Sequence, residues 1–309
     1  MNVAVIPLAL MANDPEKAAQ MTNSQFCALA RHLNGSAMSA EVASLACNRS
    51  ATCNLETVRR WTLNGWNTEK VLRLNVSSFS PADLNCCVHW AFPQAYYSVF
   101  CNVLALFNVI GRSETKHAAV IKQFGKIATE GNRFPSQLSF FADGTVKNMV
   151  FSGVSRAAGV QTIHYNKLLP ASVENQIAQF LSATREKRLD YLKNSNFKKK
   201  FKTKRGGNRK NLTEANWQQV SDSLGVTSLL SLLYRKRITA NYNDIGTIIS
   251  DYLDGEKLII DLIAIVRSCN MTIEHLIYSA IGDHDFEALH QNNPNFNFVV
   301  ESREMIDAV

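Results

Sequence analysis

Residues 94–110 read QAYYSVFCNVLALFNVI, and they lie inside a longer stretch, 86–111, that contains no Asp, Glu, Lys or Arg. A helix of this length is long enough to cross a bilayer. Its interior, however, holds polar side chains such as those of His89, Asn102 and Asn108, which hydrocarbon would leave without hydrogen-bond partners. We therefore expect a central helix that is buried in protein, and no association with a membrane.

Helical spacing of apolar residues continues upstream of this stretch. The pattern runs from Leu55 to about Ser77, with a break expected at Gly65. The next helix is expected to begin after Ser80-Pro81, because proline fits the first helical turn. Pro93 is expected to separate or kink this helix, because proline lacks the N–H that a helix interior needs.

Further helical patterns follow downstream of the apolar stretch. They cover 117–129, 135–141, 171–192, 213–233, 244–253 and 256–281. Strand signals are few, the clearest being the stretch 160–165. The sequence therefore predicts an all-α fold, a bundle of about five core helices interrupted by an inserted segment.

The pattern suggests five parts along the chain. They are an N-terminal helical extension (1–53), the first part of the helical domain (54–143), an insert with a basic loop (144–212), the second part of the helical domain (213–282) and a C-terminal tail (283–309).

Positive charge is concentrated in one segment. The 309 residues carry 33 Lys and Arg against 26 Asp and Glu, a net charge of +7. Between Arg185 and Lys210 there are 12 basic and two acidic residues, so the rest of the chain is slightly acidic. Any argument for an acidic partner therefore concerns this segment.

The basic run from 193 to 210 holds nine basic residues, no acidic residue and two phenylalanines. Such a run attracts polyanions, and phenylalanine can stack on an unpaired base. The alternative is a solvated loop without a partner. The candidate nucleic-acid-binding residues are Lys193, Lys198, Lys199, Lys200, Phe201, Lys202, Lys204, Arg205, Arg209 and Lys210.

Several classes of site lack their motifs. The sequence contains neither a G-x-G-x-x-G nor a G-x-x-x-x-G-K phosphate loop, and no H-E-x-x-H. Its seven cysteines form no C-x-x-C pair, which favours a reducing compartment, and no targeting signal is recognised. We expect a cytoplasmic protein with no cofactor and no metal site.

Two segments that lie far apart in the sequence contain more specific motifs. The first comprises Ala95-Tyr96-Tyr97-Ser98-Val99-Phe100, followed by Lys116-His117-Ala118-Ala119-Val120-Ile121 and Phe124-Gly125-Lys126. The second runs from Leu233 to Tyr242 and includes Arg237-Ile238-Thr239-Ala240-Asn241-Tyr242. Together they resemble the HEPN superfamily, the higher eukaryote and prokaryote nucleotide-binding helical domains. Members of that superfamily combine an A-Y-Y-x-x-F helix, an H-x-x-V-I-x-x-F-G helix and an R-x-x-A-D-Y motif.

The resemblance implies an all-α domain that is often a homodimer. Many relatives cleave RNA through an Arg-x(4–6)-His motif, with the Arg and His of two subunits meeting at the dimer cleft. Arg237 matches the motif arginine, but Tyr242 occupies the histidine position. A tyrosine, with a reference pKa of about 10 against about 6.5 for histidine, is a poor acid or base near neutral pH. The candidate catalytic residues are Arg237, Asn241, Tyr242 and His117.

Three readings of the Arg237-Asn241-Tyr242 group remain open: structural, phosphate-binding and catalytic. The first functional hypothesis is a nucleic-acid-binding protein, for RNA rather than DNA, of a bacterial or mobile-element defence or toxin–antitoxin system. The alternatives are a metal-independent ribonuclease that acts through Arg237, and a non-catalytic interaction module that partners a nucleotidyltransferase or a defence complex. The assignment to such systems is implied only by the roles that members of the HEPN superfamily have.

Overall fold

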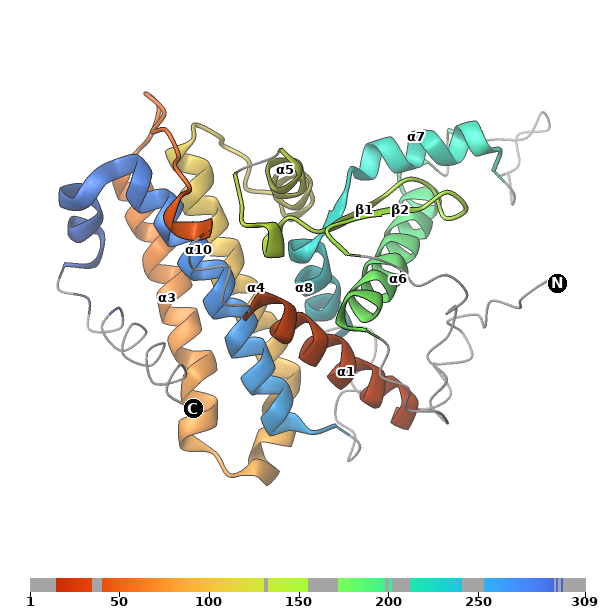
Figure 1. Ribbon diagram of the computed structural model, residues 1–309, viewed down its shortest axis with the longest axis horizontal. Helices are drawn as coiled ribbons and strands as arrows, with labels where there is room; N and C mark the ends of the chain where they lie inside the picture. The colour runs from red at the N-terminus through yellow and green to blue at the C-terminus, as the bar shows by residue number, and fades with distance from the viewer. Residues whose placement is uncertain are drawn as a thin grey trace.

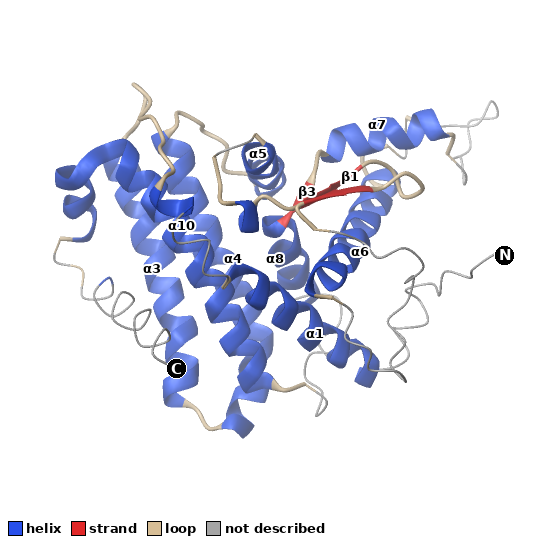
Figure 2. Cartoon of the chain, viewed as in Figure 1, coloured by secondary structure: helices blue, strands red, loops and turns tan. Residues whose placement is uncertain are grey.

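The computed structural model shows a mainly helical protein with one small sheet (Figure 1, Figure 2). The all-α prediction is confirmed, and the sheet is an addition that the sequence did not indicate. The residues that the structure describes are 15–34, 41–130, 133–154, 172–197, 200–201, 212–240, 253–291, 293 and 296.

Three long helices pack side by side at one end of the molecule (Figure 1). They are α3 (Leu55–Ser78), α4 (Pro81–Val109) and α10 (Gly255–His290). Asn54 caps the start of α3 by accepting a hydrogen bond from the Thr57 N–H, and Ser80 caps α4 in the same way. The stretch that carries no charge forms most of α4 and is largely buried, as expected. None of the described helices is both long and apolar enough to cross a membrane.

Two expected helix breaks are not observed. Gly65 lies inside a continuous α3, where a Cβ atom would come within 2.7 Å of the Asn102 Oδ1 on α4. This glycine therefore permits close helix contact and does not end a helix. Pro93 lies inside α4 and does not separate it into two helices. The real interruption of the long helices is at Gly282 in α10, whose φ of 79° is in the left-handed region.

A second group of elements lies beside these three helices. It contains α1 (Pro15–Leu33), α5 (His117–Thr129), α6 (Val173–Asn194), α7 (Glu214–Leu224) and α8 (Leu229–Ile238). The ring of Phe26 on α1 contacts Phe92 on α4 at 5.3 Å and Phe180 on α6 at 5.6 Å between centroids. Residues of the expected extension and of the expected insert thus share one hydrophobic core with α4 and α10.

The small sheet has the order β2-β1-β3 and is antiparallel. Its strands are β1 (Phe141–Asp143), β2 (Val150–Ser152) and β3 (Thr227–Ser228). The expected helix at 135–141 is shorter than predicted, because only a 3-10 turn, η2 (Ser136–Leu138), forms before β1 begins. The stretch in which the sequence indicated a strand, 160–165, lies outside the described residues.

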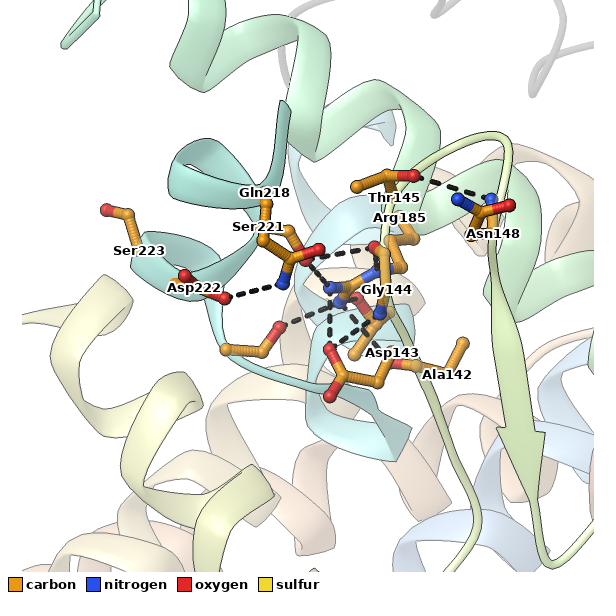
Figure 3. Close-up of polar contacts among 12 residues, drawn as sticks. Ala142, Asp143, Gly144, Thr145, Asn148, Arg185, Gln218, Ser221, Asp222 and Ser223 are labelled. Carbon is orange, nitrogen blue, oxygen red and sulfur yellow. Dashed lines mark hydrogen bonds and ion pairs between the residues drawn. The ribbon is translucent and has the colours of Figure 1, made fainter. Parts of the chain in front are cut away.

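Arg185 of α6 ties this sheet to α7. Its side chain is fully buried, and its guanidinium donates hydrogen bonds to the carbonyls of Ala142, Gly144 and Gly225 (Figure 3). It also donates to the side chains of Thr227, Asp143 and Ser221. Every nitrogen of the guanidinium therefore has an acceptor, which indicates a structural role for this cation.

A buried polar group lies between α3, α4 and α10. Arg73 donates two hydrogen bonds to Glu69, at 2.9 and 2.7 Å, and both side chains are almost completely buried. The Asn270 amide donates to Glu69 Oε2 at 2.7 Å and to Ser98 Oγ at 2.8 Å. Asn102 lies nearby on α4, and neither polar atom of its buried amide has a hydrogen-bond partner within the described part of the chain.

Candidate functional site

Aromatic residues of α4, α5 and α8 surround one arginine. We call this group the arginine–tyrosine cluster, and it consists of Tyr96, Tyr97, Phe100, His117, Tyr234 and Arg237. Tyr96 and Phe100 are one turn apart on α4 and stack at 5.3 Å between centroids. Helix α8 crosses this face, so that Tyr234 reaches Tyr96 at 5.5 Å. The two motif segments that the sequence singled out therefore meet in space.

The guanidinium of Arg237 lies over three tyrosine rings. Its Cζ is 4.8 Å from the ring centre of Tyr97, 5.5 Å from that of Tyr96 and 5.7 Å from that of Tyr234. These distances are typical of cation–π contacts. No carboxylate of the described residues forms an ion pair with Arg237, and its buried Nε has no hydrogen-bond partner among them. The ring faces thus hold the Arg237 guanidinium in place, and no carboxylate of the described residues neutralises its positive charge.

His117 opens α5 beside this cation. Its Nδ1 shares a hydrogen bond of 2.7 Å with the Tyr96 hydroxyl, and its ring lies 4.5 Å from that of Phe100. Burial lowers the pKa of His117, and the nearby charge of Arg237 lowers it further. Burial also raises the pKa of Tyr96 well above its usual value. Near neutral pH both partners are therefore uncharged, and the imidazole can accept a proton.

Further cations gather around the last turn of α8. Arg188 of α6 lies over one of the same tyrosines, with its Cζ 5.3 Å from the Tyr234 ring centre. Arg235 donates to Thr184 Oγ1 at 3.0 Å, and burial lowers the pKa of Arg235 to about 10 while Glu186 opposes the shift. Together with Arg237 these side chains make the end of α8 a concentration of positive charge, which favours an anionic ligand.

A second basic and aromatic group lies where α6 ends and α7 passes beside it. We call it the α6–α7 tip, and it consists of Lys193, Phe197, Lys200, Phe201 and Trp217. It packs on a hydrophobic cluster of its own, built on Leu189, Leu192, Phe201 and Val220 and separate from the main core. In Figure 1, α7 and the end of α6 lie at the opposite end of the molecule from α3.

The predicted site residues have three different outcomes. His117 and Arg237 lie in one cluster, and Lys193, Lys200 and Phe201 lie in the α6–α7 tip. The others lie outside the described residues: Asn241, Tyr242, Lys198, Lys199, Lys202, Lys204, Arg205, Arg209 and Lys210.

Sequence reasoning did not include Tyr234 and Trp217, which belong to these two groups, or Arg188, which contacts Tyr234. Tyr234 belongs to the second motif segment, three residues before Arg237, and this helical spacing could have placed both on one face. Arg188 and Trp217 have no comparable signal, because their cation–π partners, Tyr234 and Lys193, are distant in sequence.

Comparison with known proteins finds no matching protein family, no similar curated protein and no similar solved structure. No group of three or more His, Cys, Asp or Glu side chains that could hold a metal ion occurs within the part of the chain that the structure describes. The chemistry of the two basic and aromatic groups is therefore what indicates a function for this chain. Guanidinium and ammonium groups attract phosphate, and tyrosine, tryptophan and phenylalanine rings offer stacking surfaces.

Proposed function

We propose that this chain is a HEPN-like protein that binds nucleic acid, RNA rather than DNA, with the arginine–tyrosine cluster as a principal contact. The observation that carries the proposal is the position of Arg237, over three tyrosine rings and without an ion-paired carboxylate among the described residues. The resemblance to HEPN domains supports it, because the residues of both motif segments converge on this cluster. A role in a bacterial or mobile-element defence or toxin–antitoxin system is part of the proposal.

The chemistry of the cluster fits a nucleic acid in two ways. A guanidinium held on ring faces keeps its outer N–H groups for a phosphate, and charge-assisted hydrogen bonds of this kind are stronger than neutral ones. Tyr97 is only half-buried, so part of its ring remains accessible to an unpaired base. Preference for RNA would require contact with the 2′-hydroxyl, for which the Tyr97 and Tyr234 hydroxyls are suitable partners.

The test is the affinity of the wild type and of Arg237 variants for a labelled single-stranded RNA. We expect Arg237→Ala to weaken binding about 10-fold or more, because one charge-assisted contact and one stacking surface are lost. Arg237→Lys keeps the charge but loses the planar group, so we expect an intermediate affinity.

The matched control is Arg49→Ala, because Arg49 is paired with Asp285 at 2.7 Å and is half exposed. It should bind as the wild type does. Equal affinity of wild type and Arg237→Ala would refute the assignment of the cluster. Tighter binding of single-stranded DNA than of RNA would refute the proposed preference.

The position of His117 favours a second candidate function, a metal-independent ribonuclease. An uncharged imidazole beside a guanidinium is a general base next to a cation that stabilises a phosphorane-like charge. We nevertheless expect little intrinsic activity, because Tyr242 stands at the family's histidine position. Cleavage of RNA in excess EDTA that disappears in both Arg237→Ala and His117→Ala would establish the ribonuclease. If two copies pair, as the family habit implies, mixing the two variants would restore part of that activity.

A further inference from the structure

The lysines of the α6–α7 tip are held by ring faces. The Nζ of Lys193 lies 5.2 Å from the ring centre of Trp217, and the Nζ of Lys200 lies 5.4 Å from that of Phe197. Neither lysine forms an ion pair with a carboxylate among the residues that the structure describes. Both positive charges therefore remain available to an anion.

The same lysines sit beside aromatic surfaces that are partly open. Phe197 and Phe201 stack in parallel, with centroids 5.2 Å apart and an interplanar angle of 13°. Phe201 is the buried member of this pair, whereas Phe197 and Trp217 are only half-buried. Tyr191, in the last turns of α6, is 63% exposed. A lysine that covers a ring at an exposed site is held weakly, so a base can take its place while the ammonium turns to the phosphate.

Helix α6 connects this tip to the arginine–tyrosine cluster. Arg188 contacts Tyr234 of the cluster, and Lys193 contacts Trp217 of the tip. The two residues are five positions apart, which corresponds to a rise of about 7.5 Å along the helix. Two groups of aromatic rings with unneutralised cations therefore lie at different levels of one helix and about 140° apart around its axis, so a strand that reaches both must wind around α6.

We infer that the α6–α7 tip is a second contact for single-stranded nucleic acid, in which Trp217 and Phe197 stack on unpaired bases and Lys193 and Lys200 bind the adjoining phosphates. The inference rests on the proposed nucleic-acid-binding function but concerns a different set of residues. Duplexes, whose bases are stacked on one another, would meet only the charges of the tip. The tip therefore selects single strands over duplexes.

The experiment measures the affinity for a labelled oligouridylate of about 12 nucleotides and for a duplex RNA of the same length. Trp217→Ala should lower the affinity for the single strand about 10-fold, the equivalent of about 1.4 kcal/mol, and leave the affinity for the duplex unchanged. Trp217→Phe keeps a ring and should stay within about threefold of the wild type. Single-strand binding should quench tryptophan fluorescence in the wild type and less so in Trp217→Phe.

Lys193→Gln tests the charge and leaves the ring in place. It should reduce the slope of log affinity against log salt by about 0.7, the value for one phosphate contact on a single strand. The control is Lys257→Gln on α10, where the lysine is 3.2 Å from the Asp261 carboxylate, and its slope should not change. Thermal unfolding of each variant shows whether the fold is intact.

The outcomes separate the inference from the proposed function. If the wild type binds neither probe, both fail. If the wild type binds the single strand and Arg237→Ala weakens it, but Lys193→Gln and both Trp217 variants bind normally, the inference alone is overturned. Equal losses of single-strand and duplex affinity in Trp217→Ala also overturn it, because the ring would then contribute nothing to the recognition of unpaired bases.

Discussion

Replacing Arg185 by methionine should destabilise the protein more than replacing any other arginine of α6. Methionine fills a similar volume but donates no hydrogen bond, so each of the six acceptors around the guanidinium loses its hydrogen bond to this side chain. Three of them are backbone carbonyls of the β1–β2 hairpin and of the turn after α7. Asp143 is half exposed and contributes little, because water can solvate its carboxylate.

Leaving a buried hydrogen-bond acceptor without a donor typically costs about 1–3 kcal/mol, and several of the six acceptors are neutral groups of buried residues. We therefore expect the free energy of unfolding of Arg185→Met to fall by about 4 kcal/mol. For a chain of this length the corresponding decrease in melting temperature is about 6 °C. Urea unfolding gives the free energy, and limited proteolysis shows whether the β1–β2 hairpin is the first region to open.

Arg188→Met is the matched control, one turn further along the same helix. Its guanidinium contacts the Tyr234 ring at 5.3 Å, a contact of about 0.5–1 kcal/mol at an exposed site. Arg185→Lys keeps the charge but lacks the planar guanidinium with its several N–H donors. We therefore expect its loss of unfolding free energy to lie between those of the two methionine variants. A loss of less than about 1 kcal/mol in Arg185→Met, or equal losses at both positions, would refute the reasoning.

Other predictions concern the core, the cluster and the basic run. Phe100→Ala, at a side chain that is 5% exposed, should cost about 3–5 kcal/mol in urea unfolding. Gly65→Ala should cost about 1–2 kcal/mol through its contact with Asn102, and most of this cost should disappear in an Asn102→Ala background. Because the folded protein lowers the pKa of His117, stability should fall as pH decreases below about 6.5, and less so in His117→Gln; an unchanged pH profile would contradict this. Neutralising the four lysines within 198–202 should flatten the salt dependence of single-strand binding by up to about 3 units, and an unchanged slope would mark the run as a solvated loop.

The helices were predictable where their signals are local. Ser80-Pro81 starts α4 because the serine caps and the proline needs no N–H partner, and the apolar period of α5 ends at Thr129 as expected. Gly65 misled because its effect depends on Asn102, a residue of another helix. Strands of two or three residues carry too little periodicity to be recognised.

The arginine–tyrosine cluster was predictable only in part. The motif resemblance pointed to His117 and Arg237, and the structure places them together. It could not indicate that three ring faces hold the guanidinium, since that depends on the angle at which α8 crosses α4. Nothing in the sequence marked Arg185 as a buried residue. It lies in a basic segment, where most cations are solvated, and its acceptors come from distant parts of the chain.

The buried ion pair of Glu69 and Arg73, together with Asn270 and Ser98, also fixes the register in which the three long helices pack. Apolar helix faces are similar at every turn, so α3 could slide against α4 and α10 with little change in buried area. A slide of one turn would take the buried Asn270 amide away from Glu69 and Ser98 and leave it facing hydrocarbon side chains, which is costly. In descendants of this chain, these four positions should consequently change together, because a replacement at one of them alone would leave a buried polar partner without its hydrogen bond.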